Sequence, residues 1–350
     1  MTESTGQCSS DFPGSDPPPT SSVVIAAYNS AHLLGRTLDS IGAQTVPPDE
    51  VIVVDDGSRD ETAAIAEAHP AATRVVSQSN GGMCHARNTG IELSVGELIF
   101  VVDSDDLWHP EYVERMVRMM VDHPGASMGF ARYLPWQHPV EEPAPFEDRL
   151  EETVRLHDLE SYTSLMLAGL PVLPSFHVAR REALLRLGDR PYREQQIQGE
   201  AAYMFALLAT MGSVVEHVAP LGRYRMHANA VTGDEIDAAI RVEPCIDDLR
   251  AAAHGGLGLG LELDTARRRI IDRHAADWYR RCGRRLGGGG KRASGRRQFL
   301  KAARIGDLRA AAFWAASFVP GLSRRVWMNG WRPETVRREA GTEAWSLPDR

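Results

Sequence analysis

Residues 98–106 read Leu-Ile-Phe-Val-Val-Asp-Ser-Asp-Asp, and this stretch decides the fold class. Five consecutive apolar residues, three of them β-branched, predict a short strand that is buried on both faces. The strand runs straight into three carboxylates within four residues. Strands buried on both faces are typical of parallel sheets that helices cover from both sides. The stretch therefore predicts an α/β protein with an acidic loop at the carboxyl end of one strand.

The same strand signal recurs upstream of this stretch. Apolar runs alternate with segments whose apolar residues have helical spacing, at 23–27, 33–41, 51–54, 62–68, 74–76 and 84–93. Such alternation, in units of roughly 25 residues, indicates βαβ crossovers and a mostly parallel central sheet flanked by helices. Ligands of these sheets bind beyond the carboxyl ends of the strands. Polar residues follow three of the predicted strands, at 28–29, 55–56 and 103–106. We therefore expect one ligand site at that rim.

The bulk composition excludes several classes of protein. The 350 residues contain 39 Lys and Arg against 47 Asp and Glu, a net charge of −8, which argues against a nucleic-acid partner. The four cysteines form no CxxC pair, so they predict neither a zinc site nor a disulfide framework and fit a reducing cytoplasm. Residues 1–21 are rich in Ser, Pro, Asp and Gly, which predicts a disordered segment rather than a secretory signal. No apolar run reaches the roughly 20 residues that a membrane span needs.

The second half of the chain has a weaker pattern. Residues 134–156, rich in Pro and Glu, predict a variable loop. Helical spacing returns at 158–168, 181–187 and 199–211, and extended segments are expected at 175–178, 213–215 and 221–227. The residues after about 234 are expected to form a mainly helical region with a break at four glycines, 287–290.

Four motifs in order connect the sequence with a known family. They read Val-Ile-Ala-Ala-Tyr-Asn at 24–29, Val-Val-Asp-Asp-Gly-Ser at 53–58, Asn-Gly-Gly at 80–82 with Ala-Arg-Asn-Thr-Gly at 86–90, and Val-Asp-Ser-Asp-Asp at 102–106. Together they resemble the family 2 glycosyltransferases of the GT-A fold, and the similarity extends over roughly residues 22–230. Each motif alone is weak, whereas four with matching order and spacing are specific.

The resemblance implies an inverting, metal-dependent glycosyltransferase of the hexosyltransferase class, which uses a nucleotide-diphosphate sugar, in our prediction a UDP-sugar, with Mn²⁺ or Mg²⁺. It implies a GT-A domain over 22–232, with the nucleotide-sugar-binding half at 22–133 and the acceptor half at 134–232. The residues it assigns to the donor nucleotide are Ala27, Tyr28, Asp55, Asp56, Arg87, Asp103 and Ser104. Asp105 is the implied metal ligand, and Asp103 and His227 are further candidates. The acceptor, which is a glycan, lipid, natural product or peptide hydroxyl, is not identified by the sequence.

The expected catalytic base is where the sequence departs from the family. Relatives carry Glu-Asp at the start of a late helix, with Asp as the base, but this chain has Glu200-Ala201. We therefore assign the base to Glu200, because a carboxylate opposite the leaving diphosphate is what inversion requires. The alternative is a nucleotide-sugar-binding protein that has lost its base.

Each candidate residue also has an ordinary structural explanation. Asp at 55–56 and at 103–106 is favoured in turns and at helix N-caps. Arg87 reads equally as a surface arginine, and Glu200 as a first-turn acid that stabilises the helix dipole. The shared rim favours the functional interpretation for the Asp residues.

Residues 267–304 contain fourteen Lys and Arg against two acids. With nearby aromatic residues, this basic segment predicts either a helical cap with a solvated basic face, which we favour, or peripheral contact with the inner face of an anionic membrane.

Overall fold

The fold is given by a computed structural model, and the residues it describes fall into two units. The described residues are 17–137, 142–147, 150, 152–167, 172–194, 200–226, 235–257, 259, 261–319, 322 and 326, with the side chains of 167, 200 and 235–242 left aside. The first unit comprises Met1–Leu156, Leu173–Leu185 and Gly212–Arg225, and the second comprises His157–Val172, Arg186–Met211 and Met226–Arg350. The predicted division into donor and acceptor halves stays a prediction.

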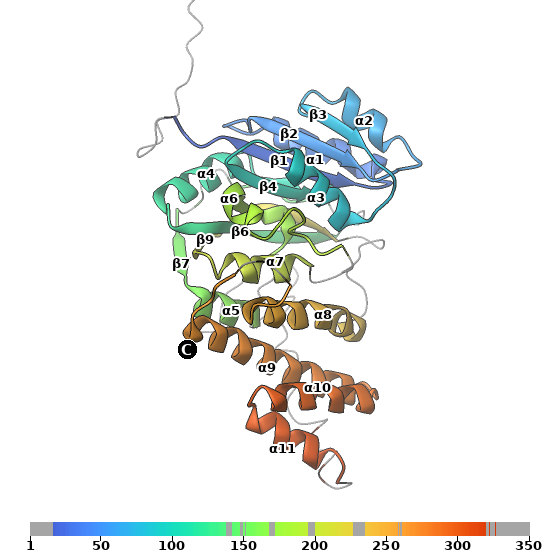
Figure 1. Cartoon of the computed structure of the whole chain (residues 1–350). Helices are drawn as coiled ribbons and strands as arrows, with labels where there is room; N and C mark the ends of the chain where they lie inside the picture. The colour runs from blue at the N-terminus through green and yellow to red at the C-terminus, as the bar shows by residue number, and fades with distance from the viewer. Residues whose placement is uncertain are drawn as a thin grey trace, which may run out of the picture. The chain divides into compact units, whose positions relative to one another are not determined.

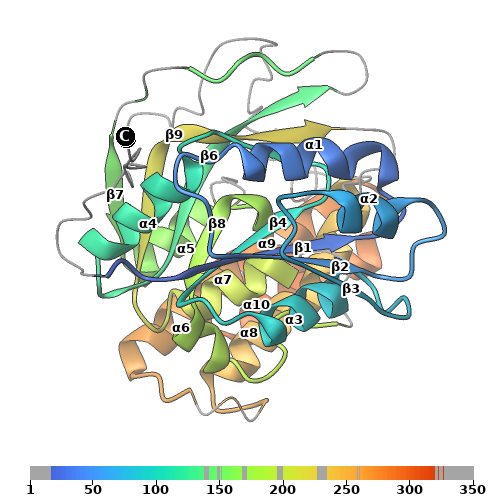
Figure 2. The ribbon, with the colours of Figure 1, turned by 90° about the horizontal axis from the view of Figure 1, so that it is seen from above.

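The first unit is built on one sheet (Figures 1 and 2). Its strands are β1 (Ser21–Ala27), β2 (Glu50–Asp55), β3 (Arg74–Ser77), β4 (Leu98–Asp103), β5 (Leu107–Trp108), β6 (Ala126–Gln137), β7 (Val154–His157), β8 (His177–Arg180) and β9 (Ser213–Met226). Its helices are α1 (Ala31–Gly42), α2 (Thr62–Ala68), α3 (Met83–Leu93), α4 (Tyr112–Asp122), the 3₁₀ helix η1 (Pro174–Phe176) and α6 (Arg181–Leu185). Among the described residues the sheet order is β3-β2-β1-β4-β8-β6-β9-β5, with β7 paired to β9.

The centre of this sheet is parallel, as predicted. β1 pairs in parallel with both β2 and β4, and β2 pairs in parallel with β3. Beyond β4 the pairs β4–β8, β6–β8 and β5–β9 are antiparallel. The α/β fold and the four upstream strands are therefore confirmed. The extended segments expected at 175–178, 213–215 and 221–227 fall largely in η1, β8 and β9, but their antiparallel pairing was not predicted.

Helices cover both faces of the parallel strands. One face packs Val23 and Ile25 of β1 against apolar residues of α1 and α4, including Leu34 and Met116. The opposite face packs Ile52 and Val54 of β2 against Ala86 of α3, and Figure 2 shows α1 and α3 on opposite sides of β1 and β2. Alternate residues of each strand are thus buried on alternate faces, which is why the strands read as continuous apolar runs.

Gly90 sets how closely α3 approaches the sheet. A Cβ atom built at Gly90 would lie 2.2 Å from Cγ1 of Val24 on β1. Only a glycine lets the helix backbone come this near to the strand. The glycine that closes the 86–90 motif therefore has a packing role.

The predicted variable loop at 134–156 is partly wrong. Residues 134–137 complete β6, and residues 154–156 belong to β7. Between them, Arg223 donates hydrogen bonds to the carbonyls of Ala144 and Pro145, at 3.2 and 2.9 Å. Local composition did not show these strands because their pairing partner, β9, lies far along the chain.

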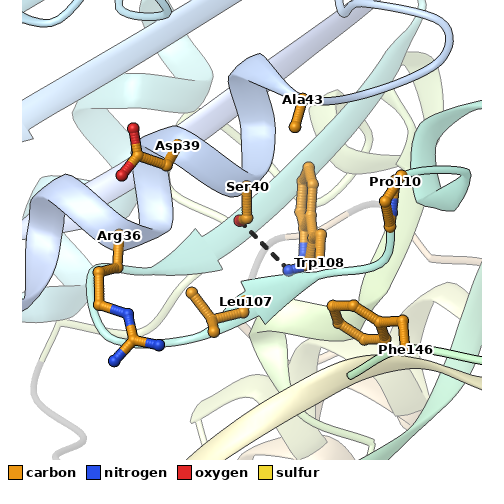
Figure 3. A pocket seen from close by; sticks show the side chains of 8 residues that line it. All are labelled: Arg36, Asp39, Ser40, Ala43, Leu107, Trp108, Pro110 and Phe146. Carbon is orange, nitrogen blue, oxygen red and sulfur yellow. Dashed lines mark hydrogen bonds between the residues drawn. The ribbon is translucent and has the colours of Figure 1, made fainter. Parts of the chain in front are cut away.

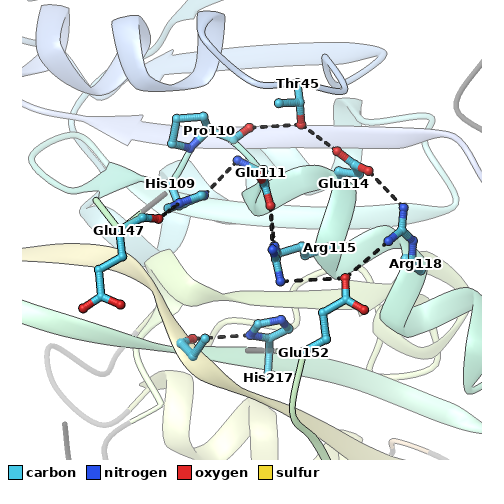
Figure 4. Close-up of polar contacts among 11 residues, drawn as sticks. Thr45, His109, Pro110, Glu111, Glu114, Arg115, Arg118, Glu147, Glu152 and His217 are labelled. Atoms are coloured by element: carbon cyan, nitrogen blue, oxygen red, sulfur yellow. Dashed lines mark hydrogen bonds and ion pairs between the residues drawn. The ribbon is translucent and has the colours of Figure 1, made fainter. Parts of the chain in front are cut away.

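The segment 142–152 is also held by His109, which precedes α4, and by two ionic contacts with arginines of α4 (Figure 4). His109 Nε2 lies 3.2 Å from the carbonyl oxygen of Glu147. The carboxylate of Glu152 lies 3.5 Å from Arg118 and 3.9 Å from Arg115. The described part of 142–152 is thus anchored to the body of the first unit.

The second unit is helical, as predicted for the region after residue 234. Its helices are α5 (Leu159–Leu167), α7 (Glu200–Leu208), α8 (Glu235–Ala253), α9 (Thr265–Gly288), α10 (Arg292–Arg304) and α11 (Leu308–Ala316). The predicted break at 287–290 is confirmed, since α9 ends at Gly288 and Gly290 has a positive φ of 87°. None of the helices formed by described residues is long and apolar enough to cross a bilayer.

Candidate nucleotide and metal site

Three strand ends meet at one rim of the sheet, as the sequence predicts. Ala27, the last residue of β1, is the register partner of Asp55, the last residue of β2. Its neighbour Ala26 is the register partner of Asp103, the last residue of β4. Because the strands are adjacent and parallel, the residues that follow them emerge side by side. All of these residues belong to the first unit.

The turn after β1 leaves Tyr28 accessible. Tyr28 is 48% exposed, unusually high for a tyrosine beside buried strands. Asn29 has a positive φ of 48°, and its backbone N–H donates to Ser58 Oγ over 2.9 Å while its Oδ1 accepts from Arg59 N over 2.8 Å. These bonds fix the turn, so the Tyr28 ring is available to stack on a planar ligand.

Asp55 and Asp56 have different environments. Asp56 is buried, and its carboxylate accepts from Gln78 Nε2, Gly81 N and Gly82 N over 2.7–2.9 Å. It therefore holds the glycine turn that leads into α3. Asp55 is buried as well, at 4% exposed, but its carboxylate accepts only one hydrogen bond among the described residues, from Ser58 N over 3.2 Å. The contacts thus assign Asp56 to the order of the loop, while donor binding by Asp55 stays a prediction.

Arg87 is not the surface arginine of the ordinary interpretation. It is 1% exposed, and its Nη2 is paired with Oδ1 of Asp103, whose side chain is 29% exposed. Charge-assisted pairs of this kind are strong where one partner is buried. Arg87 thus fixes one oxygen of Asp103 and leaves the carboxylate partly open to the rim.

The loop 104–106 is held from behind by Arg225 of β9. Arg225 Nε donates to the backbone carbonyl of Asp105 over 2.6 Å, and Arg225 N donates to Oδ1 of Asp106 over 2.9 Å. Asp106 is fully buried, and burial, together with the charges of Asp105 and Asp103, raises its pKa well above the usual range for a carboxyl. Asp106 therefore braces the loop from within.

Three residues missed by the sequence analysis support the acidic loop. Ser175 Oγ accepts from Asp103 N over 3.0 Å, and the carbonyl of Ser175 accepts from Trp108 Nε1 over 2.7 Å. His177 follows on β8, where burial lowers its pKa to about 4 and its Nδ1 lies 2.6 Å from the carbonyl oxygen of Pro174. No local pattern in the sequence marks Ser175.

The loop continues into β5, where a pocket lies on the α1 side (Figure 3). The pocket has a volume of about 310 Å³, and its lining includes Leu107, Trp108, Ala43 and Phe146. Trp108 N lies 3.3 Å from Ser40 Oγ, and its indole stacks on Tyr112 with centroids 4.3 Å apart. These contacts fix the direction of the chain after Asp106, and the polar residues Arg36 and Asp39 of α1 also line the pocket.

The carboxylates suit a hard divalent cation. Mg²⁺ and Mn²⁺ prefer oxygen ligands and commonly take one or two carboxylates, with substrate phosphates and water completing the shell. Asp103 and Asp105 supply such oxygens on one loop whose backbone is fixed by Arg225. Within the described ranges no three His, Cys, Asp or Glu side chains already form a metal-binding cluster. The donor set therefore fits a metal completed by a ligand.

The structure describes the other predicted site residues only in part. Glu200 is the first residue of α7 in the second unit, and its side chain is outside the described set. His227 is outside the described residues. Ser104 lies in the turn between Asp103 and Asp105. Cys84 is buried at 4% exposure on α3, as expected of a packed thiol.

The strand order, the rim and the acidic loop define the class: an α/β nucleotide-binding fold of the GT-A type. Solved structures share it. The chain matches TarS of S. aureus in complex with UDP-GlcNAc with a TM-score of 0.54 and 18% identity, over 86% of this chain and 92% of that one. It matches mannosyltransferase PcManGT of Pyrobaculum calidifontis, in complex with GDP-Man and Mn²⁺, with a TM-score of 0.50 and 19% identity over 89% and 84%. At these identities the likeness shows the fold.

Sequence comparison then gives the family: residues 22–155 match the model of glycosyl transferase family 2, and the chain carries a domain of that family. EpsH of Bacillus subtilis, which is named as a glycosyltransferase, is 28% identical over 231 residues, 61% of this chain and 62% of EpsH. Succinoglycan biosynthesis protein ExoO of Rhizobium meliloti is 39% identical over 118 residues, 33% of this chain and 34% of ExoO. The chain thus spans less than two thirds of the length of either relative.

Proposed function

We propose that the chain is a metal-dependent, inverting glycosyltransferase that takes a sugar from a nucleotide-diphosphate donor. The observation that carries the proposal is the convergence of Asp55, Asp103 and Asp105 at the ends of adjacent parallel strands. The ion pair of the buried Arg87 with the partly exposed Asp103 supports it, because it places a fixed positive charge beside an accessible carboxylate at the rim. The family 2 domain at 22–155 supports the same reaction class.

The proposed donor contacts follow from the exposure and bonding of each residue. The Tyr28 ring, beside Ala27, would stack on the base, and the free part of the Asp55 carboxylate would accept its N–H groups. Asp103 and Ser104 would contact the ribose. TarS binds UDP-GlcNAc and PcManGT binds GDP-Man, and we propose UDP for this chain.

Asp105, together with Asp103, is the proposed ligand set for Mn²⁺ or Mg²⁺, and His227 is a third candidate. A bound divalent cation would act as a Lewis acid that stabilises the charge on the departing diphosphate. Arg225 offers a second positive charge, because its Nη2 is buried and lacks an acceptor among the described residues. That N–H group suits an anionic oxygen of the donor.

Glu200 is the proposed general base. Inversion requires the acceptor hydroxyl to attack the anomeric carbon on the side opposite the diphosphate, and a carboxylate there removes its proton. The acceptor half at 134–232, the unidentified acceptor hydroxyl and the cytoplasmic location belong to the same proposal. We expect nucleic acid to play no part.

A donor screen tests the proposal directly. Thermal unfolding of the full chain would be followed with UDP-, GDP- and dTDP-sugars in the presence of Mn²⁺, and with each sugar in EDTA. A bound donor at a hundred times its Kd stabilises by about 2.7 kcal/mol, which raises Tm by several degrees. The increase should require both metal and Asp105. If no donor raises Tm with Mn²⁺ or Mg²⁺, the donor site is wrongly assigned.

The second candidate is a nucleotide-sugar-binding protein without transfer. The observation that favours it is Ala201, which stands where relatives carry the base and is buried at 6% exposure on α7. Single-turnover assays of the wild type and the Glu200→Gln variant distinguish the two. Turnover that disappears in Glu200→Gln, with donor binding intact, supports the enzyme, whereas donor binding with no turnover in either protein supports the binder.

A further inference from the structure

The outward side of α11 in the second unit is apolar. Leu308 is 83% exposed, the highest value for a large apolar residue in the described part of the chain. Ala312 and Ala315 are exposed one and two helical turns further on. Val319 and Leu322, each 47% exposed, follow beyond the end of α11 at Ala316. Leu308, Ala312 and Ala315 have the spacing of residues along one line of a helix, and we name these five exposed apolar residues the α11 stripe.

The inward side of α11 is also apolar, and the one polar group buried beside it belongs to the C-cap residue Ser317. Ser317 is buried at 1% exposure, where its hydroxyl and carbonyl oxygens accept hydrogen bonds from Arg296 at 3.0 and 2.9 Å. Ala310 is buried, and Phe313 packs against Phe299 of α10 with centroids 5.7 Å apart. An ordinary surface helix turns its apolar residues inward and its polar residues to water. In α11 apolar residues lie on the outward side as well as on the inward side, so packing against α10 leaves the exposed apolar residues without a partner among the described residues.

Two aromatic side chains widen the exposed apolar surface. Phe318 is 54% exposed and Trp314 is 37% exposed, and their rings meet edge to face with centroids 5.2 Å apart. Aromatic residues of this kind are enriched where a protein meets the headgroup level of a bilayer.

The charge around the α11 stripe is positive. Residues 291–322 contain seven Lys and Arg against a single acid, Asp307. Asp307 is already used, since it caps α11 through Ala310 N and accepts from Arg280 Nε over 2.8 Å. Arg304 and Arg309 flank Leu308 in the sequence, both exposed and without an acidic partner among the described residues. The stripe is therefore accompanied by uncompensated positive charge.

We propose that the α11 stripe and its arginines form a docking surface for an anionic phospholipid membrane. Apolar residues would enter the acyl boundary while the arginines contact lipid phosphates, the usual arrangement of an interfacial helix. A second copy of the chain suits this surface less, because it would bring the same arginines together without counter-charge. The proposal concerns binding only and does not depend on the transfer reaction.

Vesicle flotation of the full-length chain tests the proposal. The probes are vesicles of phosphatidylcholine alone and of phosphatidylcholine with an equal amount of phosphatidylglycerol, at low and at physiological salt. We expect flotation with the anionic vesicles, decreasing as salt rises. Leu308→Glu should weaken it on the order of tenfold. Arg304→Ser with Arg309→Ser should weaken it about thirtyfold, since each arginine near the surface contributes about a factor of five.

Matched control variants distinguish the effect of the docking surface on flotation from the effect of net charge. Val95, 77% exposed in the first unit, receives the same substitution as Val95→Glu. Arg268→Ser with Arg269→Ser removes the same charge from the exposed start of α9. Both controls should float as the wild type does.

Four results would overturn the proposal. The first is no flotation with anionic vesicles at low salt, and the second is equal losses for Leu308→Glu and Val95→Glu. The third is a wild-type dimer that Leu308→Glu converts to a monomer while vesicles bind neither, which would identify a second copy as the occupant. A fall in Tm for Leu308→Glu without vesicles, with no loss of flotation, would show that the chain itself covers the stripe.

Discussion

Arg225 Nε donates a hydrogen bond of 2.6 Å to the backbone carbonyl of Asp105. The two residues are 120 positions apart, and the bond joins β9 to the acidic loop after β4. The guanidinium also stacks over Trp136, 4.9 Å from the ring centroid, so it has little freedom to move. The carbonyl is occupied from behind, which leaves the carboxylate of Asp105 as the part of the residue that can serve a metal.

We expect Arg225→Lys to weaken metal-dependent donor binding about tenfold while the protein stays folded. A lysine keeps the charge but not the planar donor, and hydrogen bonds of charged groups contribute roughly 1.5–3 kcal/mol. Isothermal titration with donor and Mn²⁺ measures the change. Arg223→Lys is the control, because Arg223 holds Ala144 and Pro145 instead. Equal losses in both variants would contradict a specific role for Arg225.

We expect Asp105→Asn and Asp106→Asn to have different effects on donor binding. Asp105→Asn should remove metal-dependent donor binding, because it removes the charge of the proposed ligand. Asp106→Asn should change donor binding less than about threefold, since an amide oxygen can still accept from Arg225 N and the buried site disfavours the charged carboxylate. Donor titrations monitored by intrinsic fluorescence give both values. Loss of binding in Asp106→Asn with unchanged Tm would assign Asp106 to the ligand.

Asp56→Asn should destabilise the fold more than Asp55→Asn. The Asp56 carboxylate accepts three hydrogen bonds, from Gln78, Gly81 and Gly82, and an amide would turn a donor toward at least one of them. A buried donor without an acceptor costs about 1–3 kcal/mol. Urea denaturation measures this loss of unfolding free energy. For Asp55→Asn we expect near-normal stability and weaker binding of free UDP; the reverse pattern would exchange the two roles.

Stability should fall as the pH is lowered from about 6.5 toward 4, in part because of His177. Burial lowers the pKa of His177 to about 4, whereas an unfolded histidine titrates near 6.5. Between these values the unfolded chain binds more protons, so each step to lower pH favours unfolding. In His177→Asn the slope of Tm against pH should flatten over this range. The exposed His32→Gln is the control, and an unchanged slope in His177→Asn would contradict the assignment.

Much of the first unit could be predicted because its parallel strands are continuous apolar runs that end in polar residues. Such strands are buried on both faces, so neighbouring positions obey the same local rule. The carboxyl ends of 23–27, 51–54 and 98–102 meet at one rim, as their βαβ connections require. The candidate residues Asp55, Asp56 and Asp103 were identified from these ends alone.

The antiparallel strands were harder to predict. β6, β8 and β9 pair with residues far along the chain, and a strand's preference depends on the partner that covers it. The segment 134–156 therefore read as a loop, although its ends belong to β6 and β7. Ser175 shows the same difficulty at the site, because its contact with Asp103 joins residues 72 positions apart.

The sequence by itself determined the α/β class, the acidic rim and the family, because local periodicity and short motifs encode them. Only the tertiary structure decided what each carboxylate does there. Asp56 is enclosed by backbone N–H groups, Asp106 is buried under Arg225, and Asp103 stays partly open beside the buried Arg87. Burial and hydrogen bonding set the chemistry of a carboxylate, and both come from residues distant in the chain. The outward apolar side of α11 was likewise visible only in the tertiary structure, since the sequence does not say which side of a helix faces water.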